Sequence, residues 1–142
     1  MLNPNRASSL AAVSADMVSA GEFKRGIELM DKAMQLNPHH PGWYYCVPCL
    51  VHYCQQDYDA ALIESRRINS PGFYWEHILS AATLGQLNQK VEAELALADL
   101  LSVRPDFVEI QNELLRRRYV LSPEIAEMLL QGLRKAGLPG AG

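Results

Sequence analysis

The chain has 142 residues, 49% of them hydrophobic, which is enough to bury a core as a single domain. Its formal net charge of −3 and pI near 5.8 argue against nucleic-acid binding, because no basic surface is available to meet phosphates. No run approaches the roughly 18 apolar residues of a membrane span, and the N-terminus lacks an apolar leader. The three cysteines lie within 46–54 and form no disulfide framework, so we expect a cytoplasmic protein in a reducing compartment.

Prolines divide the chain at nearly even intervals of 33 or 34 residues. They are Pro4, Pro38, Pro71 and Pro105. Proline lacks an N–H and cannot continue a helix, so each one separates two units. A period of about 34 residues is typical of stacked helical hairpins. The predicted repeats are 7–38, 39–71 and 72–105.

The first two repeats each show two amphipathic runs separated by a turn. In the first, helices are predicted over 7–19 and from Phe23 to just before Pro38, with Gly21 closing the first helix. In the second, helices are predicted over 43–55 and 58–68. Pro48 would cost about 3 kcal/mol inside a helix, so we expect that helix to begin near 43–45 or to bend at Pro48.

The third repeat offers two positions for its turn. We place the turn at Asn88 rather than Gly85, because asparagine tolerates the left-handed conformation and the period is preserved. The predicted helices are then 73–86 and 90–103. Gly85 becomes an interior helical glycine, which costs about 1 kcal/mol relative to alanine.

The two ends of the chain depart from the repeat. Residues 106–137 are predicted to form a capping pair of helices, and 138–142 are a tail. The second helix of the pair should begin at Ser122-Pro123-Glu124, where Ser122 is the N-cap, Pro123 the first helical residue and Glu124 an acid in the first turn. Residues 1–6 match the end of a repeat whose body is absent. We therefore expect a preceding hairpin to be missing and the 7–19 helix to self-associate through its apolar face. That face carries Leu10, Val13 and Met17.

Small residues recur where the helices of each hairpin should touch. Seven residues before the turn stand Ser14, Cys49 and Ala81, and five residues after it stand Gly26, Ala61 and Ala93. Because helices approach closely only where side chains are small, this pattern supports the predicted pairing. The fold class expected is all-α.

The first repeat carries a set of regularly spaced small, apolar and turn residues, which are Leu10, Ser14, Met17, Gly21, Phe23, Gly26, Ala33 and Pro38. In these positions it resembles the tetratricopeptide repeat, and the resemblance extends over residues 2–105. The resemblance implies a right-handed α-solenoid of antiparallel helical hairpins, with about eight helices in three repeats and a C-terminal capping pair. It also implies a single domain spanning 1–142.

Three segments carry a narrower resemblance. Residues 37–44, 65–71 and 132–139 are similar to the C-terminal repeat region of bacterial multidomain regulators. In those proteins a class III nucleotide cyclase domain or a winged-helix domain precedes the repeats. The resemblance implies a regulatory or scaffolding segment of a larger signalling protein.

Eight of the eleven aromatic residues fall within 43–75, which points to a binding surface. Tetratricopeptide arrays bind partners on the concave face formed by the first helix of each hairpin. In this sequence that face should carry Trp43, Cys46, Leu50, Tyr53, Trp75, Ile78, Ala82 and Gln86. Trp and Tyr are enriched at binding hot spots, and the face lacks a Lys or Arg cluster, so we expect an apolar helix or extended segment of a protein partner. The alternative is that some of these aromatics only fill the junctions between hairpins.

The cysteines raise two other interpretations. Cys46-Val47-Pro48-Cys49 is similar to a redox Cys-x-Pro-Cys motif, but no strand precedes it and Cys49 is expected at a helix contact. Cys46, Cys49, His52 and Cys54, with His39 and His40 nearby, include metal-ligand types, but tetrahedral zinc usually draws its ligands from more than one element. His77 is expected to serve in packing and to point away from Glu76. We therefore expect no catalytic, cofactor or metal residues. The functional alternatives are an oligomerisation or spacer segment and, more remotely, a redox or metal site.

Overall fold

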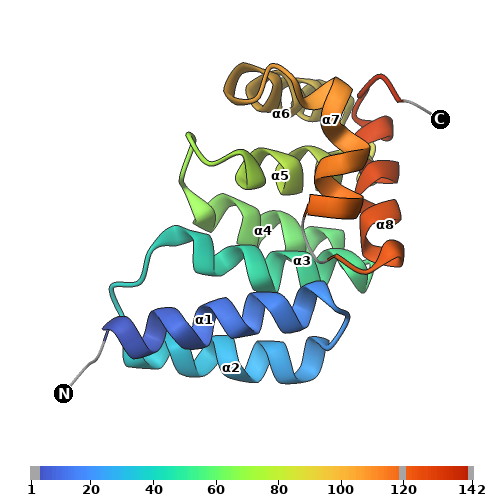
Figure 1. The fold of residues 1–142 in the computed structure, drawn as a ribbon. Helices are drawn as coiled ribbons and strands as arrows, with labels where there is room; N and C mark the ends of the chain where they lie inside the picture. The colour runs from blue at the N-terminus through green and yellow to red at the C-terminus, as the bar shows by residue number, and fades with distance from the viewer. Residues whose placement is uncertain (1–3, 119–120, 141–142) are drawn as a thin grey trace.

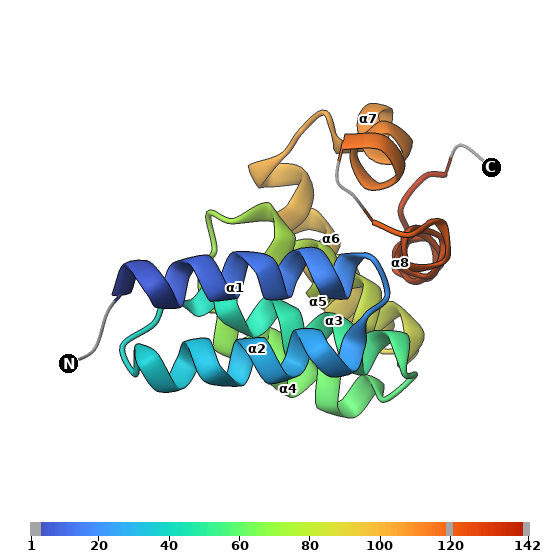
Figure 2. The same cartoon turned by 60° about the horizontal axis from the view of Figure 1, so that its bottom comes forward.

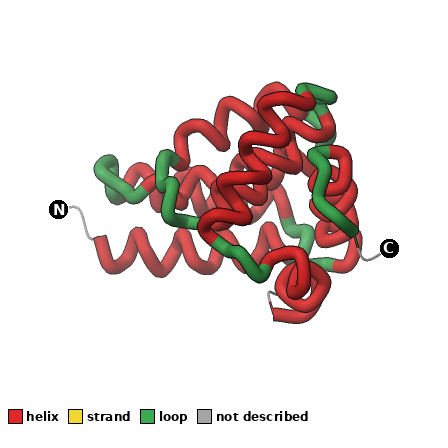
Figure 3. Tube along the Cα trace, turned by 90° about the horizontal axis from the view of Figure 1, so that it is seen from above, coloured by secondary structure: helices red, strands yellow, loops and turns green. Residues whose placement is uncertain are grey.

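The computed structural model describes residues 4–118 and 121–140, and these form helices joined by loops, without strands (Figure 3). Eight α-helices, one 3-10 turn and one π-helical turn follow one another along this described part of the chain. They are α1 (Pro4–Ser19), α2 (Phe23–Leu36), the 3-10 turn η1 (Gly42–Tyr45), α3 (Cys46–Cys54), α4 (Tyr58–Ile68), α5 (Tyr74–Gln86), α6 (Lys90–Val103), α7 (Phe107–Glu113), the π turn η2 (Leu114–Arg118) and α8 (Pro123–Lys135). The prediction of an all-α chain with about eight helices is confirmed. Within the described residues, no helix is long and apolar enough to cross a membrane.

Consecutive helices pack in pairs, α1 with α2, α3 with α4 and α5 with α6 (Figures 1 and 2). Each pair is joined by a short turn in which one residue has a positive φ. These residues are Gly21 at 95°, Gln56 at 63° and Asn88 at 58°. The left-handed residue reverses the chain immediately after the helix ends. The placement of the third turn at Asn88 is confirmed.

Small residues lie at the helix contacts, as predicted. The Ser14 hydroxyl donates a hydrogen bond to the Gly26 carbonyl at 2.5 Å, and the Cys49 thiol donates to the Ala61 carbonyl at 3.3 Å. All four residues are buried. A Cβ at position 26 would collide with the Val18 side chain and lie tightly against the Ser14 carbonyl. The backbones of α1 and α2 therefore leave no room for a larger residue at this position.

The helix starts show how two prolines are accommodated. Residues 42–45 form the 3-10 turn and α3 begins at Cys46, so Pro48 is the third residue of α3. The first N–H groups of a helix lack partners within it, so a proline at this position costs little. α3 begins one residue after the predicted start at 43–45, and the 3-10 turn occupies the predicted positions. α1 already includes Pro4, before the predicted start at residue 7, and the first turn of a helix tolerates proline.

The C-terminal helix α8 lies across the ends of α1, α3 and α5 rather than over the outer face of α6 (Figure 1). At its start the Ser122 amide donates to the Ser19 carbonyl at 2.8 Å, and near its end the Lys135 ammonium donates to the Gln86 side chain at 2.9 Å. On α6, Val91 and Leu95 remain 73% and 63% exposed. The expected capping pair therefore does not cover the end of the helix stack, because α8 buries its apolar face elsewhere.

Glycines allow α8 to approach α5 closely. A Cβ at Gly85 would collide with the carbonyl of Gly132, and a Cβ at Gly132 would collide with the Tyr53 hydroxyl and the Ala82 carbonyl. Glycine weakens a helix, but the close contact between the backbones of α5 and α8 explains why position 85 is a glycine.

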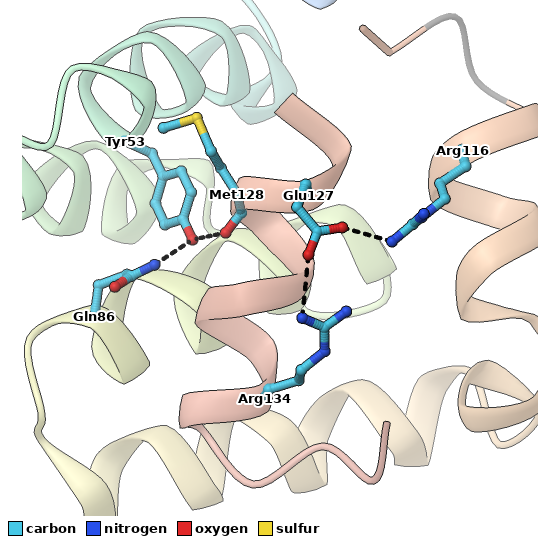
Figure 4. Close-up of polar contacts among 6 residues, drawn as sticks. All are labelled: Tyr53, Gln86, Arg116, Glu127, Met128 and Arg134. Carbon is cyan, nitrogen blue, oxygen red and sulfur yellow. Dashed lines mark hydrogen bonds and ion pairs between the residues drawn. The ribbon is translucent and has the colours of Figure 1, made fainter. Parts of the chain in front are cut away.

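Glu127 connects α8 to its surroundings on the exposed side. Its carboxylate accepts from the Arg116 guanidinium at 2.5 Å and from Arg134 at 3.2 Å (Figure 4). Glu127 is 53% exposed, so these ion pairs orient the helix more than they stabilise it.

Candidate binding cavity

A cavity of about 290 Å³ lies where α1, the start of α3, the start of α5 and Leu121 meet. Its lining is mostly apolar. The residues are Ala15, Asp16, Val18, Ser19, Trp43, Cys46, Val47, Leu50, Phe73, Trp75, Leu79 and Leu121. Three helices that are distant in sequence thus contribute to one apolar site that remains open to the surface.

The two tryptophans reach the cavity from equivalent places in neighbouring hairpins. Trp43 lies in the 3-10 turn before α3, with its ring edge-to-face with Tyr44 at a centroid distance of 4.7 Å. Trp75 is the second residue of α5 and is stacked with Tyr74 at 6.3 Å. Both indoles are only partly buried, so they present ring surface to the cavity while neighbouring rings orient them.

The predicted concave face is divided into two parts. Trp43, Cys46, Leu50 and Trp75 line the cavity, whereas Tyr53, Ile78, Ala82 and Gln86 do not. Tyr53, Ile78 and Ala82 are completely buried. The expectation that Tyr53, Ile78 and Ala82 are open to a partner is therefore wrong, while Gln86 is only partly buried.

The chain's own C-terminal helix covers this second part of the face. The Tyr53 hydroxyl donates to the Met128 carbonyl at 2.5 Å and accepts from the Gln86 amide at 3.2 Å (Figure 4). Gln86 also accepts from Lys135, and Gly132 lies directly over Ala82. Helix α8 occupies the place where a guest had been expected, and only the part near the tryptophans remains open.

Several cavity residues were not identified from the sequence. Ser14 on α1 and Cys49 on α3 occupy equivalent positions of their repeats. In the same register Ala15 corresponds to Leu50 and Val18 to Tyr53. Both α1 residues could therefore have been identified from the predicted face. Leu121 carried no such signal, because the path of its segment depends on where α8 packs.

The thiols have no activating environment. Burial, and secondarily the charge of Glu76, raises the pKa of Cys46 from 9.0 to about 12, and burial alone raises that of Cys54 to about 12. Burial also raises the pKa of Cys49 well above 9.0. A reactive cysteine needs a lowered pKa, whereas the pKa values of these three thiols are raised, as is usual for cysteines that only take part in packing. No group of three or more His, Cys, Asp or Glu side chains in the described ranges is placed to hold a metal ion.

His77 supports the loop before α5. It is buried, and its Nε2 lies 2.6 Å from the Pro71 carbonyl, as expected of a packing residue. The expectation that it points away from Glu76 is wrong, because its Nδ1 lies 3.9 Å from the Glu76 carboxylate. Glu76 is in the first turn of α5 and bends back to accept from the Ser70 amide at 2.8 Å, which brings the two side chains together.

No protein-family model, curated protein or solved structure matches this chain.

Proposed function

We propose that the chain is a non-enzymatic interaction module of the tetratricopeptide type, in which antiparallel hairpins stack into a right-handed α-solenoid. In this proposal it is the C-terminal part of a larger bacterial regulatory protein of the cytoplasm. The paired helices, their left-handed turn residues and the small residues at their contacts support this architecture. The function proposed is to hold an apolar segment of a protein partner in the cavity.

The observation that carries the proposal is the presence of Trp43 and Trp75 on one open apolar cavity. Indole rings have large contact areas and little conformational freedom to lose, which is why tryptophan dominates binding hot spots. Both rings pack against the hydrophobic core but are only partly buried, so each keeps some ring surface for a guest. Their exposure carries a free-energy cost that a bound guest would relieve.

The size of the cavity limits the guest. A volume of about 290 Å³ is at the lower end of small-ligand sites, which suits one or two side chains of a docked segment. Because α8 blocks the other part of the face, a long helix could not lie along the whole groove. We therefore expect a short segment with one dominant anchoring side chain.

The proposal is tested by capturing partners from host lysate and titrating the captured protein against the purified chain. The wild type is compared with the Trp43→Ala/Trp75→Ala variant after circular dichroism has shown equal helicity. Loss of two hot-spot residues should weaken binding roughly 30-fold or more. A matched control is Ile63→Ala/Leu95→Ala, which removes two exposed apolar side chains that do not line the cavity.

A partner bound equally by the wild type and the tryptophan variant would contradict the proposal. So would a partner lost only in the Ile63→Ala/Leu95→Ala control, because the binding surface would then lie on the outer faces of α4 and α6.

A second candidate is an oligomerisation or spacer segment that controls a preceding effector domain. It is favoured by Val13 on α1, which is 45% exposed and lies near the partly buried Leu10 and Met17. Light scattering over a concentration series tests it. A mass that rises with concentration in the wild type and not in Val13→Asp would favour self-association, and a constant monomer would contradict it.

A further inference from the structure

Among the residues whose side chains the structure describes, Asp16 is the one charged side chain on the cavity lining. It is exposed on α1, and none of those described side chains forms an ion pair with it. The described lining includes no Lys, Arg or His. A guest in the cavity therefore meets an exposed carboxylate at the border of an apolar surface.

The end of α1 adds to this negative field. Asp16 lies in the last turn of the helix, where the backbone carbonyls form the negative pole, and that turn carries no basic residue. An acid at this end of a helix is unfavourably placed, so its position is not explained by helix stability. One of the terminal carbonyls, that of Ser19, accepts from the Ser122 amide, while the exposed Asp16 side chain lies between solvent and the cavity.

The aromatic walls also favour a positive charge. Trp43, Phe73 and Trp75 line the same cavity, and the faces of aromatic rings attract cations within about 6 Å of the centroid. Glu76 does not line the cavity, but its charge contributes to the raised pKa of Cys46, which does. Its charge is partly directed to the Ser70 amide and to His77.

We propose that the guest segment carries a Lys or Arg directly beside its apolar anchoring side chain, and that Asp16 pairs with this cation at the mouth of the cavity. The inference rests on the proposed function, because it specifies the chemistry of the same guest. It goes further by predicting that the cavity selects guests by charge, accepting cations and rejecting anions.

Three small probes share one apolar body and differ in charge. They are 2-phenylethylamine, which is cationic at neutral pH, neutral 2-phenylethanol and anionic 3-phenylpropionate. Trp43 and Trp75 are the two tryptophans of the chain, and both line the cavity, so their fluorescence reports its occupancy directly. The probes lack an indole and do not interfere with that signal.

Affinity should decrease from amine to alcohol to carboxylate in the wild type at low salt. Each step should be on the order of two- to fivefold, the range of an exposed ion pair. In Asp16→Asn the three affinities should converge to within about twofold, with the alcohol unchanged. Asp31→Asn is the matched control, since Asp31 is exposed on α2 and does not line the cavity, and it should keep the wild-type order.

The outcomes separate this inference from the proposed function. Saturable binding of the alcohol would show that the apolar cavity is a binding site. If in that case the three probes bind equally, or the carboxylate binds best, the charge selection is overturned. An order that persists in Asp16→Asn with the wild-type ratios also overturns the role of Asp16. If no probe changes the tryptophan emission up to its solubility limit, the cavity does not accept guests, and the proposed function fails together with the inference.

Discussion

The hydroxyl of Tyr53 donates a hydrogen bond to the backbone carbonyl of Met128 at 2.5 Å, joining residues 75 positions apart. The same hydroxyl accepts from the Gln86 amide at 3.2 Å, so α3, α5 and α8 meet at one oxygen atom (Figure 4). Tyr53 is completely buried, and water has no access to replace these bonds. This junction holds α8 on the face that a partner could otherwise use.

Tyr53→Phe should lower the free energy of unfolding by about 1–2 kcal/mol. The substitution keeps the ring but leaves the Gln86 amide without its acceptor in a partly buried place. Urea unfolding followed by circular dichroism measures the change. Tyr58→Phe is the control, because it removes the same atom from the neighbouring ring, 5.4 Å away, and should cost less than about 0.5 kcal/mol. Equal losses in the two variants would show that the junction adds nothing.

Gly132→Ala should destabilise the chain by about 1–3 kcal/mol, despite alanine's better helix propensity. The added methyl would meet the Tyr53 hydroxyl and the Ala82 carbonyl, and a backbone carbonyl cannot turn aside as a side chain can. Gly72→Ala is the matched control, since nothing lies within 4 Å of its added methyl and its φ is not positive. Thermal unfolding of the two variants should differ clearly. A stable Gly132→Ala protein would mean that α8 and α5 do not approach as closely as the structure shows.

Gln56→Gly should stabilise the chain by about 0.5–1 kcal/mol. Gln56 has φ 63°, a left-handed conformation that costs a residue with a Cβ about 1–2 kcal/mol and costs glycine almost nothing. Asn88 has nearly the same φ, but asparagine tolerates it, so Asn88→Gly should change stability less. Chemical denaturation of both variants at matched conditions provides the comparison. The reverse order would show that the Gln56 side chain contributes interactions that outweigh its backbone strain.

Stability should fall as the pH rises above 9.0, and Cys46 should contribute part of that fall. Burial raises the pKa of Cys46 from 9.0 to about 12, so the folded state keeps the proton that the unfolded chain releases between these values. More protons on the folded state mean that the free energy of unfolding decreases with pH, by at most about 1.4 kcal/mol per unit for one thiol. The contribution is fully present below pH 9.0 and lost as the pH approaches 12.

Cys46→Ala isolates this contribution. Its unfolding free energy should change less between pH 8 and pH 10 than that of the wild type. Cys54→Ala should show a comparable difference, because burial raises the pKa of Cys54 to about 12 as well. Identical pH slopes in the wild type and Cys46→Ala would mean that the thiol is not desolvated and could act as a nucleophile.

The sequence by itself predicts most of the helices and the three turns that join them in pairs. Asn88 is favoured over Gly85 as the third turn, Pro48 favours a late helix start, and the pairs Ser14–Gly26 and Cys49–Ala61 indicate close helix contacts. All of these depend on interactions between residues near one another in the chain, such as backbone conformation, missing N–H groups and side-chain size at a hairpin. Local chemistry of that kind can be read directly from residue order.

Only the tertiary structure decided where α8 lies and which part of the aromatic face stays open. The apolar face of α8 has the period of a helix, but that period does not specify the surface against which it packs. Its position depends on the Gly85–Gly132 approach and the Tyr53–Met128 hydrogen bond, both formed between residues distant in sequence. Because this packing buries Tyr53 and leaves Trp43 and Trp75 partly exposed, the candidate site is a property of the assembled helices rather than of any single repeat.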